Sequence, residues 1–293
     1  MRHLFCLLGL ALAHSLGCAQ GFPAKPIQFI VQYAPGSGAD QLARVVSDAV
    51  QRESGSGFVI RNLPGALAVI GTSALVKSPA DGYTVGICSA SVNSIAPSLF
   101  KSLPYDPGAD FTFIEPLAAY TYVVSSAPEL GFAKLDDLVQ HAQANPTKLS
   151  YVYANATAQV LAAALARSLR IQALAVPYKA AQEGLADMSQ NRVSFGITDV
   201  GVTVPMVKSA RVKPLAVISA RRSASLPDVP SLAEQGRTPP EVTAWAGLCG
   251  PRNMPPEAVT WLRQQVRKAS TRPEVLEKLT LLGREPLAWG TTS

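Results

Sequence analysis

After its first twenty residues, the sequence alternates between short apolar segments of strand type and segments of helical spacing, and this alternation constrains the fold more than any other feature. Apolar runs at 27–33, 58–60 and 83–88 are separated by two segments, 40–50 and 69–77, whose apolar residues recur at helical spacing. Strand, helix, strand, helix, strand is the pattern of a parallel sheet covered by helices. The first part of the chain is therefore predicted to form an α/β unit.

A second block of the same kind follows in the middle of the chain. Residues 111–125 form a long β-rich stretch, broken by Pro116, which we interpret as a strand followed by a segment that crosses between the blocks. Two α/β blocks and a return segment are predicted. The elements expected after residue 125 are a helix at 135–142, a helix capped by Thr157, strands at 149–153, 173–176, 193–198 and 214–218, a proline-rich linker at 226–230, a strand at 244–249, and helices from about Pro255 and Pro273.

Residues 1–19 have the order of a secretory signal peptide. Basic Arg2 and His3 precede an apolar run at 4–13, and small residues follow at 17–19. We expect cleavage after Ala19 and export across a membrane. There are two alternatives: a buried N-terminal helix, and a lipoprotein cut before Cys18, which is disfavoured because Ser15 stands where an apolar residue is wanted.

Cleavage would leave two cysteines, Cys88 and Cys249, in the mature chain. An oxidising compartment would allow them to form a disulfide. Each also lies in an apolar strand-type segment, where a buried free thiol is equally expected, so the sequence leaves both possibilities open. Neither cysteine has a CxxC partner or a nearby histidine, so no metal site and no cofactor are expected.

The charged residues point away from nucleic acid and from catalysis. The 26 basic residues are spread along the chain, with Arg221-Arg222 as the longest basic run, whereas a nucleic-acid-binding face would cluster them. No segment reaches the ~18 apolar residues of a membrane span. The one histidine left after cleavage, His141, lies on a polar helix face, which argues against a Ser-His-Asp triad. These residues therefore offer no catalytic set, and we expect that the chain is not an enzyme.

Two loops that leave strand ends are the candidate binding elements, because ligands of open α/β sheets bind beyond the carboxyl ends of the strands. The first, Tyr33–Asp40, carries Gly36 and Gly38 just before a helix whose free N–H groups favour an anion. The second, Tyr153–Gln159, offers amide and hydroxyl donors at another helix start. Neither loop contains Arg or Lys, so a bound anion is expected to meet neutral donors. An ordinary capped turn is the alternative for each loop.

A series of ordered motifs resembles the periplasmic solute-binding proteins of tripartite tricarboxylate transporters, also called the Bug family. The resemblance covers nearly all of the chain after the signal segment. The motifs are Phe22-Pro23-Ala24-Lys25-Pro26-Ile27, Pro35-Gly36-Ser37-Gly38-Ala39-Asp40 with Ala43-Arg44, Asn62-Leu63-Pro64-Gly65-Ala66, Asp81-Gly82-Tyr83-Thr84, Pro97-Ser98-Leu99-Phe100, Leu103-Pro104-Tyr105-Asp106-Pro107, Val176-Pro177-Tyr178-Lys179, Leu226-Pro227-Asp228-Val229-Pro230-Ser231 and Trp245-Ala246-Gly247-Leu248.

This resemblance implies an α/β, two-lobed periplasmic-binding-protein fold of type II, in which each lobe is a mixed, mostly parallel sheet flanked by helices and two segments cross between the lobes. Residues 22–122 and 223–293 would form the first lobe, and residues 123–222 the second. Family members bind small carboxylates between the lobes and deliver them to an integral-membrane permease. A monomer is expected. The alternative function is a ligand-sensing subunit that signals to a membrane kinase.

The chain departs from the family pattern at several positions, which leaves the identity of the carboxylate open. The first loop is usually Gly-Gly-Gly-Thr-Asp, but Ser37 and Ala39 stand here, and the usual Asp-Asn after a later strand is Thr198-Asp199. The chain also stops soon after Trp289, without the usual final helix. The expected ligand-binding residues are Tyr33, Pro35, Gly36, Ser37, Gly38, Ala39, Asp40, Ser89, Ser91, Tyr153, Ala154, Asn155, Ala156, Thr157, Gln159, Tyr178, Thr198 and Asp199.

Overall fold

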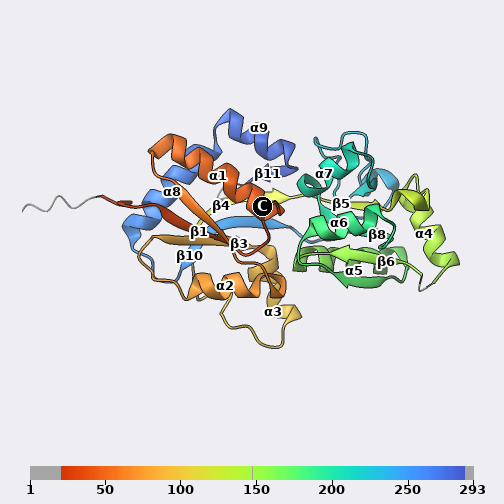
Figure 1. The fold of residues 1–293 in the computed structure, drawn as a ribbon, viewed down its shortest axis with the longest axis horizontal. Coiled ribbons are helices and arrows are strands. Elements are labelled where there is room, and N and C mark those ends of the chain that lie inside the picture. The colour runs from red at the N-terminus through yellow and green to blue at the C-terminus, as the bar shows by residue number, and fades with distance from the viewer. Residues whose placement is uncertain (1–20, 147, 288–293) are drawn as a thin grey trace, which may run out of the picture.

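The chain forms two lobes, each built around its own β-sheet (Figure 1). The computed structural model describes residues 21–146 and 148–287. The N-terminal and C-terminal parts of the chain share one lobe, and the middle of the chain forms the other (Figure 1). Within the described residues, no helix is both long and apolar enough to span a bilayer. The predicted signal segment and the end of the chain after Trp289 lie outside the described residues.

The first lobe contains a mixed sheet with the strand order β11-β4-β10-β3-β1-β2. Strands β1 to β4 run in one direction, and β10 and β11 run in the other. The strand β10, which follows the second lobe in the chain, therefore lies between β4 and β3 of the first block. The strands are β1 (Ile27–Val31), β2 (Phe58–Asn62), β3 (Thr84–Ser89), β4 (Phe111–Tyr120), β10 (Trp245–Pro251) and β11 (Arg284–Pro286).

Alternation along the strands sends apolar side chains to both faces of this sheet, and helices cover each face. Phe29 packs with residues of α1 (Gly38–Ser54), α8 (Pro256–Ser270) and α9 (Pro273–Leu281). Its neighbour Ile30 faces the other way and packs in the cluster that contains Leu75 of α2 (Val69–Val76). A π-helical turn at Ala90–Ile95 and the short α3 (Ala96–Leu99) follow β3. The period-2 pattern of the strands thus fixes which helix lies on which face.

The second lobe repeats this plan with the strand order β7-β6-β8-β5-β9. Strands β6 to β9 share one direction and β5 opposes them. Mixed α/β lobes of this kind confirm the predicted fold class. The elements are β5 (Tyr122–Ser126), β6 (Ser150–Tyr153), β7 (Leu174–Pro177), β8 (Phe195–Asp199) and β9 (Lys213–Val217), with α4 (Leu135–Ala144), α5 (Ala156–Leu169), α6 (Ala181–Ser189) and α7 (Val200–Lys208).

The chain crosses between the sheets at Thr121, after β4, and again just before β10. The proline-rich segment after residue 223 was expected in the first lobe, but it packs on the second sheet. The Val217 N–H donates to the Pro230 carbonyl, and the Leu232 N–H donates to the Val217 carbonyl. Leu226 and Val229 lie in an apolar cluster with Val217. The segment covers edge strand β9, whose unpaired backbone groups would otherwise need other partners.

A disulfide joins Cys88 of β3 to Cys249 of β10, with 5.8 Å between the Cα atoms. The two strands are antiparallel neighbours, and both cysteines are fully buried. The structure therefore selects the disulfide from the two possibilities that the sequence left open. The bond ties the first block of the chain to the strand that returns from the second lobe.

Candidate functional site

Two adjoining cavities lie between the lobes, and residues of both lobes line them. Their volumes are about 60 Å³ and about 40 Å³, and one water needs about 10–15 Å³ by such a measure. Five residues line both cavities, so we treat them as one cleft: Tyr33, Ser37, Gly38, Asn155 and Asp199.

The first wall of the cleft is the start of α1. Ser37 is the N-cap, and its Oγ accepts a hydrogen bond from the Asp40 N–H at 3.3 Å. The preceding Gly36 has φ +77°, a left-handed conformation that glycine adopts without strain. Gly38 and Ala39 are the first two residues of the helix, where N–H groups have no partner within the helix. Both residues line the first cavity, so this wall presents backbone donors and the positive end of a helix dipole.

Asp40, predicted as a ligand-binding residue, is turned away from the cleft and braces the loop. Its Oδ2 accepts from the Gly36 N–H at 2.8 Å, Arg44 donates to both oxygens at 2.9 and 3.0 Å, and Asn62 Nδ2 donates to Oδ1 at 2.9 Å. Burial raises the pKa of this carboxyl, but these hydrogen bonds outweigh it and hold the pKa below its usual value. The carboxylate therefore stabilises the loop in its ionised form.

The Asp40→Asn variant is expected to lose about 1–2 kcal/mol of unfolding free energy at pH 7. Since the folded pKa of Asp40 is lowered, its contribution is fully present above the unfolded pKa and is lost as the pH falls below that value and through the lower folded pKa. Urea unfolding at pH 7 and pH 3 measures the difference. Asp48→Asn, on the exposed side of the same helix, is the control. An equal loss at both pH values would contradict the assigned role.

The opposite wall is the start of α5. Asn155 is the N-cap of this helix, and not Thr157 as expected, because its Oδ1 accepts from the Ala158 N–H at 2.8 Å. The Tyr122 hydroxyl donates to the same oxygen at 3.2 Å. Thr157 lies inside the first turn, where its N–H donates to Ser91 Oγ at 3.1 Å and its hydroxyl lies 2.8 Å from that oxygen. Ser91 belongs to the first lobe, so these bonds join the two lobes directly.

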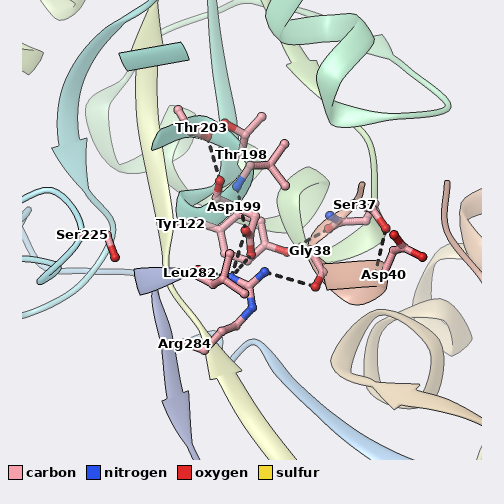
Figure 2. A network of polar contacts seen from close by, with 12 residues as sticks. Ser37, Gly38, Asp40, Tyr122, Thr198, Asp199, Thr203, Ser225, Leu282 and Arg284 are labelled. Atoms are coloured by element: carbon pink, nitrogen blue, oxygen red, sulfur yellow. Dashed lines mark hydrogen bonds and ion pairs between the residues drawn. The ribbon is translucent and has the colours of Figure 1, made fainter. Parts of the chain in front are cut away.

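A third helix start, that of α7, meets the cleft at Asp199. This carboxylate caps the helix by accepting from the Val202 N–H at 3.3 Å. Arg284 of β11, in the first lobe, places Nη1 3.0 and 2.9 Å from its two oxygens (Figure 2). Burial raises the pKa of Asp199, and Arg284 opposes that shift. Three helix starts and one neutralised carboxylate therefore converge on the cleft.

Aromatic side chains form the rest of the first cavity. Tyr33, Tyr120, Tyr122 and Trp245 line it together with Ile87. Burial raises the pKa of Tyr33, so its hydroxyl stays protonated at neutral pH. The cavity therefore offers apolar ring surface for the body of a ligand and hydroxyl groups for its polar atoms.

The structure brings most of the predicted residues to the cleft. Those that line the first cavity are Tyr33, Ser37, Gly38, Ala39, Ser89, Ser91, Asn155, Thr157 and Asp199, and Ala154 and Thr198 line the second. Tyr153 instead packs in the core of the second lobe, and the Tyr178 hydroxyl donates to Asp187 at 2.8 Å. The linings also do not include Pro35, Gly36, Asp40, Ala156 and Gln159. Their contact with a ligand stays a prediction.

Several lining residues were missed from the sequence. Tyr120 and Tyr122 flank the first crossing, and Ala244 and Trp245 lie at the second. A crossing segment must pass the floor of the cleft, so the lobe boundary expected at residue 122 was the usable signal. Lys179, exposed in the loop after β7, lines the second cavity although neither predicted loop contains a cation. Nothing in the sequence pointed to Arg284.

Two α/β lobes, two crossings and a cleft lined from both sides define a two-lobed binding protein of the periplasmic type. A family model described as the tripartite tricarboxylate transporter family receptor matches residues 42–291. The chain belongs to this family, and the predicted Bug-type resemblance is confirmed.

Relatives of known name and structure agree with this assignment. The protein BugT of Bordetella pertussis is 28% identical over 98% of this chain and 90% of its own length. The solved structure of the periplasmic binding protein BugD is 26% identical, with a TM-score of 0.85 over 91% of this chain and 89% of that one. The structure of Rpa4515 of R. palustris with adipate is 28% identical, with a TM-score of 0.86 over 90% of this chain and 89% of that one. This chain is thus similar to them in sequence, length and fold.

Proposed function

We propose that this protein captures a small organic carboxylate in the cleft between its lobes and delivers it to an integral-membrane permease. One observation carries the proposal: helices from opposite lobes, α1 and α5, point their N-terminal ends into one cavity. Helix N-termini bind anions through their free N–H groups and their dipole. A ligand held from both sides stabilises the closed arrangement of the lobes.

The carboxylate is proposed to accept hydrogen bonds from the N–H groups of Gly38 and Ala39. The Oδ1 of Asn155 is already used by Ala158 and Tyr122, so its amide N–H groups are left to donate to a ligand. Hydrogen bonds to a charged partner are worth about 1.5–3 kcal/mol each, so three or four suffice for micromolar binding after ordering costs. The adipate in the R. palustris relative supports this ligand class.

The cellular setting follows from the same proposal. The family is one of transporter receptors, which supports a permease partner and favours transport over sensing. Residues 1–19 are proposed to be a signal peptide removed after Ala19, so that the protein acts as a monomer in the periplasm, with binding rather than catalysis as its activity. The expected lobe boundary at residue 122 stays part of the proposal, and the second boundary is proposed just before β10 instead of at residue 223.

A small carboxylate is expected to raise the melting temperature of the purified protein. At a ligand concentration of one hundred times Kd, the added stability is about 2.7 kcal/mol. Thermal melts and calorimetry with a panel of mono- and dicarboxylates that includes adipate test this, and adipamide serves as the neutral control for adipate. Amides should have a weaker effect than their acids, because they carry no charge for the helix starts to bind.

Native mass spectrometry of protein taken from the periplasm extends the test. It should give the mass of a chain that starts at Gln20, with a small acid bound. If no acid of the panel changes the melting temperature and no anion accompanies the native protein, the proposed function is overturned. A retained Met1 or a lipid on Cys18 would contradict the proposed cleavage alone.

A further inference from the structure

Asp199 presents an electrostatic problem for a cleft that takes anions. Its carboxylate lines both cavities and lies against the start of α1, since a Cβ added to Gly38 would be 3.0 Å from its Oδ2. A ligand carboxylate on the Gly38 and Ala39 N–H groups would therefore lie close beside it. Two carboxylates that share a site repel each other strongly, and one of them resists ionisation.

Arg284 is placed to remove this repulsion. Its side chain is fully buried, and Nη1 contacts both oxygens of Asp199 while also donating to the Leu282 carbonyl at 2.6 Å. Nη2 donates to the Gly38 carbonyl at 3.2 Å, and the guanidinium lies 4.2 Å from the centre of the Tyr120 ring. Figure 2 shows the guanidinium pointing between Asp199 and the first turn of α1. These contacts hold the cation in one position.

The position of Arg284 also keeps it from taking a ligand itself. It is absent from the linings of both cavities, and its two Nη atoms, the ends of the side chain, are used for Asp199, Gly38 and Leu282. Among the residues that line the cavities, the charged ones are Asp199 and Lys179. Lys179 is exposed, so solvent screens its charge, whereas the buried pair acts at short range.

We propose that Arg284 sets the charge selectivity of the cleft: by neutralising Asp199 from behind, it allows an anionic ligand to occupy the start of α1. This inference rests on the proposed function and names the residue on which its preference for acids depends. Arg284 is thus a positioning and charge-compensating residue, supplied by the last described strand of the chain.

The test compares adipate with adipamide, or the most tightly bound acid of the panel with its own amide, by calorimetry at pH 7.5. For Arg284→Met, the preference for the acid over the amide should fall by on the order of tenfold or more, because Asp199 is left as an uncompensated charge. For Asp199→Asn, the preference should rise, since Arg284 is then unopposed. The double variant should return to within about threefold of the wild type.

Arg267→Met is the matched control. Arg267 lies on α8, outside the linings of both cavities, and pairs with Glu115 of β4, so the preference should not change. If Arg284→Met does not fold, the double variant carries the test, because it has no unpaired charge: a folded double variant that has lost the acid preference overturns the inference. An unchanged preference in both single variants also overturns it. If the wild type binds no acid, both the proposed function and the inference fail. If the wild type binds acids but the variants keep its preference for them, only the inference fails.

Discussion

Replacing both Cys88 and Cys249 by alanine is expected to lower the free energy of unfolding by about 3–5 kcal/mol. The disulfide closes a loop with a sequence separation of 161 residues, which contains the whole second lobe. In the chain-entropy account, the stabilisation grows with the length of the closed loop and reaches about 5 kcal/mol here. For a chain of this size, the melting temperature should fall by roughly 10 °C.

Reduction of the wild-type protein provides the control for this prediction. Wild type unfolded in the presence of reductant should resemble the double variant, apart from a small cost for the volume lost at the two buried side chains. The double variant itself should not respond to reductant. If wild type melts at the same temperature with and without reductant, the disulfide does not contribute as expected.

A tryptophan at Ser91 is expected to reduce ligand affinity by about a hundredfold while leaving the lobes folded. Ser91 lines the first cavity and hydrogen-bonds Thr157 of the opposite lobe. A tryptophan side chain at this position would occupy the space that a ligand needs and would press on Thr157 of the opposite lobe, so it would hold the lobes apart. Calorimetry with the tightest acid of the panel measures the affinity, and small-angle scattering should show a larger radius of gyration.

The same substitution at Ser98 is the matched control for bulk and hydrophobicity. Ser98 lies in α3 of the same lobe and is exposed to solvent. Ser98→Trp should therefore keep wild-type affinity and radius. Wild-type affinity in the Ser91→Trp variant would show that the acid does not bind in this cleft.

Local sequence patterns were sufficient for most of the elements. The alternation of strand-type and helical spacing predicted β1, α1, β2, α2 and β3 to within a few residues, because each element buries one face or both and its period shows this. The helices α6 and α7 were not predicted. Gly184 in α6 and Pro205 in α7 weaken the local helical signal, and packing on the second sheet outweighs that weakness.

The candidate site was only partly predictable, because tertiary packing also decides which side chains face the cleft. Ser37 and Asn155 lie at strand-to-helix loops, whose position beyond a strand end is visible in the sequence. Asp40 lies in the same loop as Ser37, but its carboxylate points to Arg44 and Asn62 and not to the cleft. The direction of a side chain within a loop depends on partners elsewhere in the chain, so a local pattern does not decide it.

The sequence by itself determined the α/β character of both blocks, the helix starts that offer N–H groups to an anion, and the family to which the chain belongs. Those features depend on short-range periodicity, on loop composition and on motif order. Only the tertiary structure decided that Cys88 bonds Cys249, that the segment after residue 223 covers β9, and that Arg284 meets Asp199. The disulfide and the ion pair join residues that are far apart in sequence, and the segment after residue 223 covers a sheet edge that exists only after the strands have assembled. Distance in space between such groups is set by how the two sheets and the two crossings assemble, and no local pattern of residues carries that information.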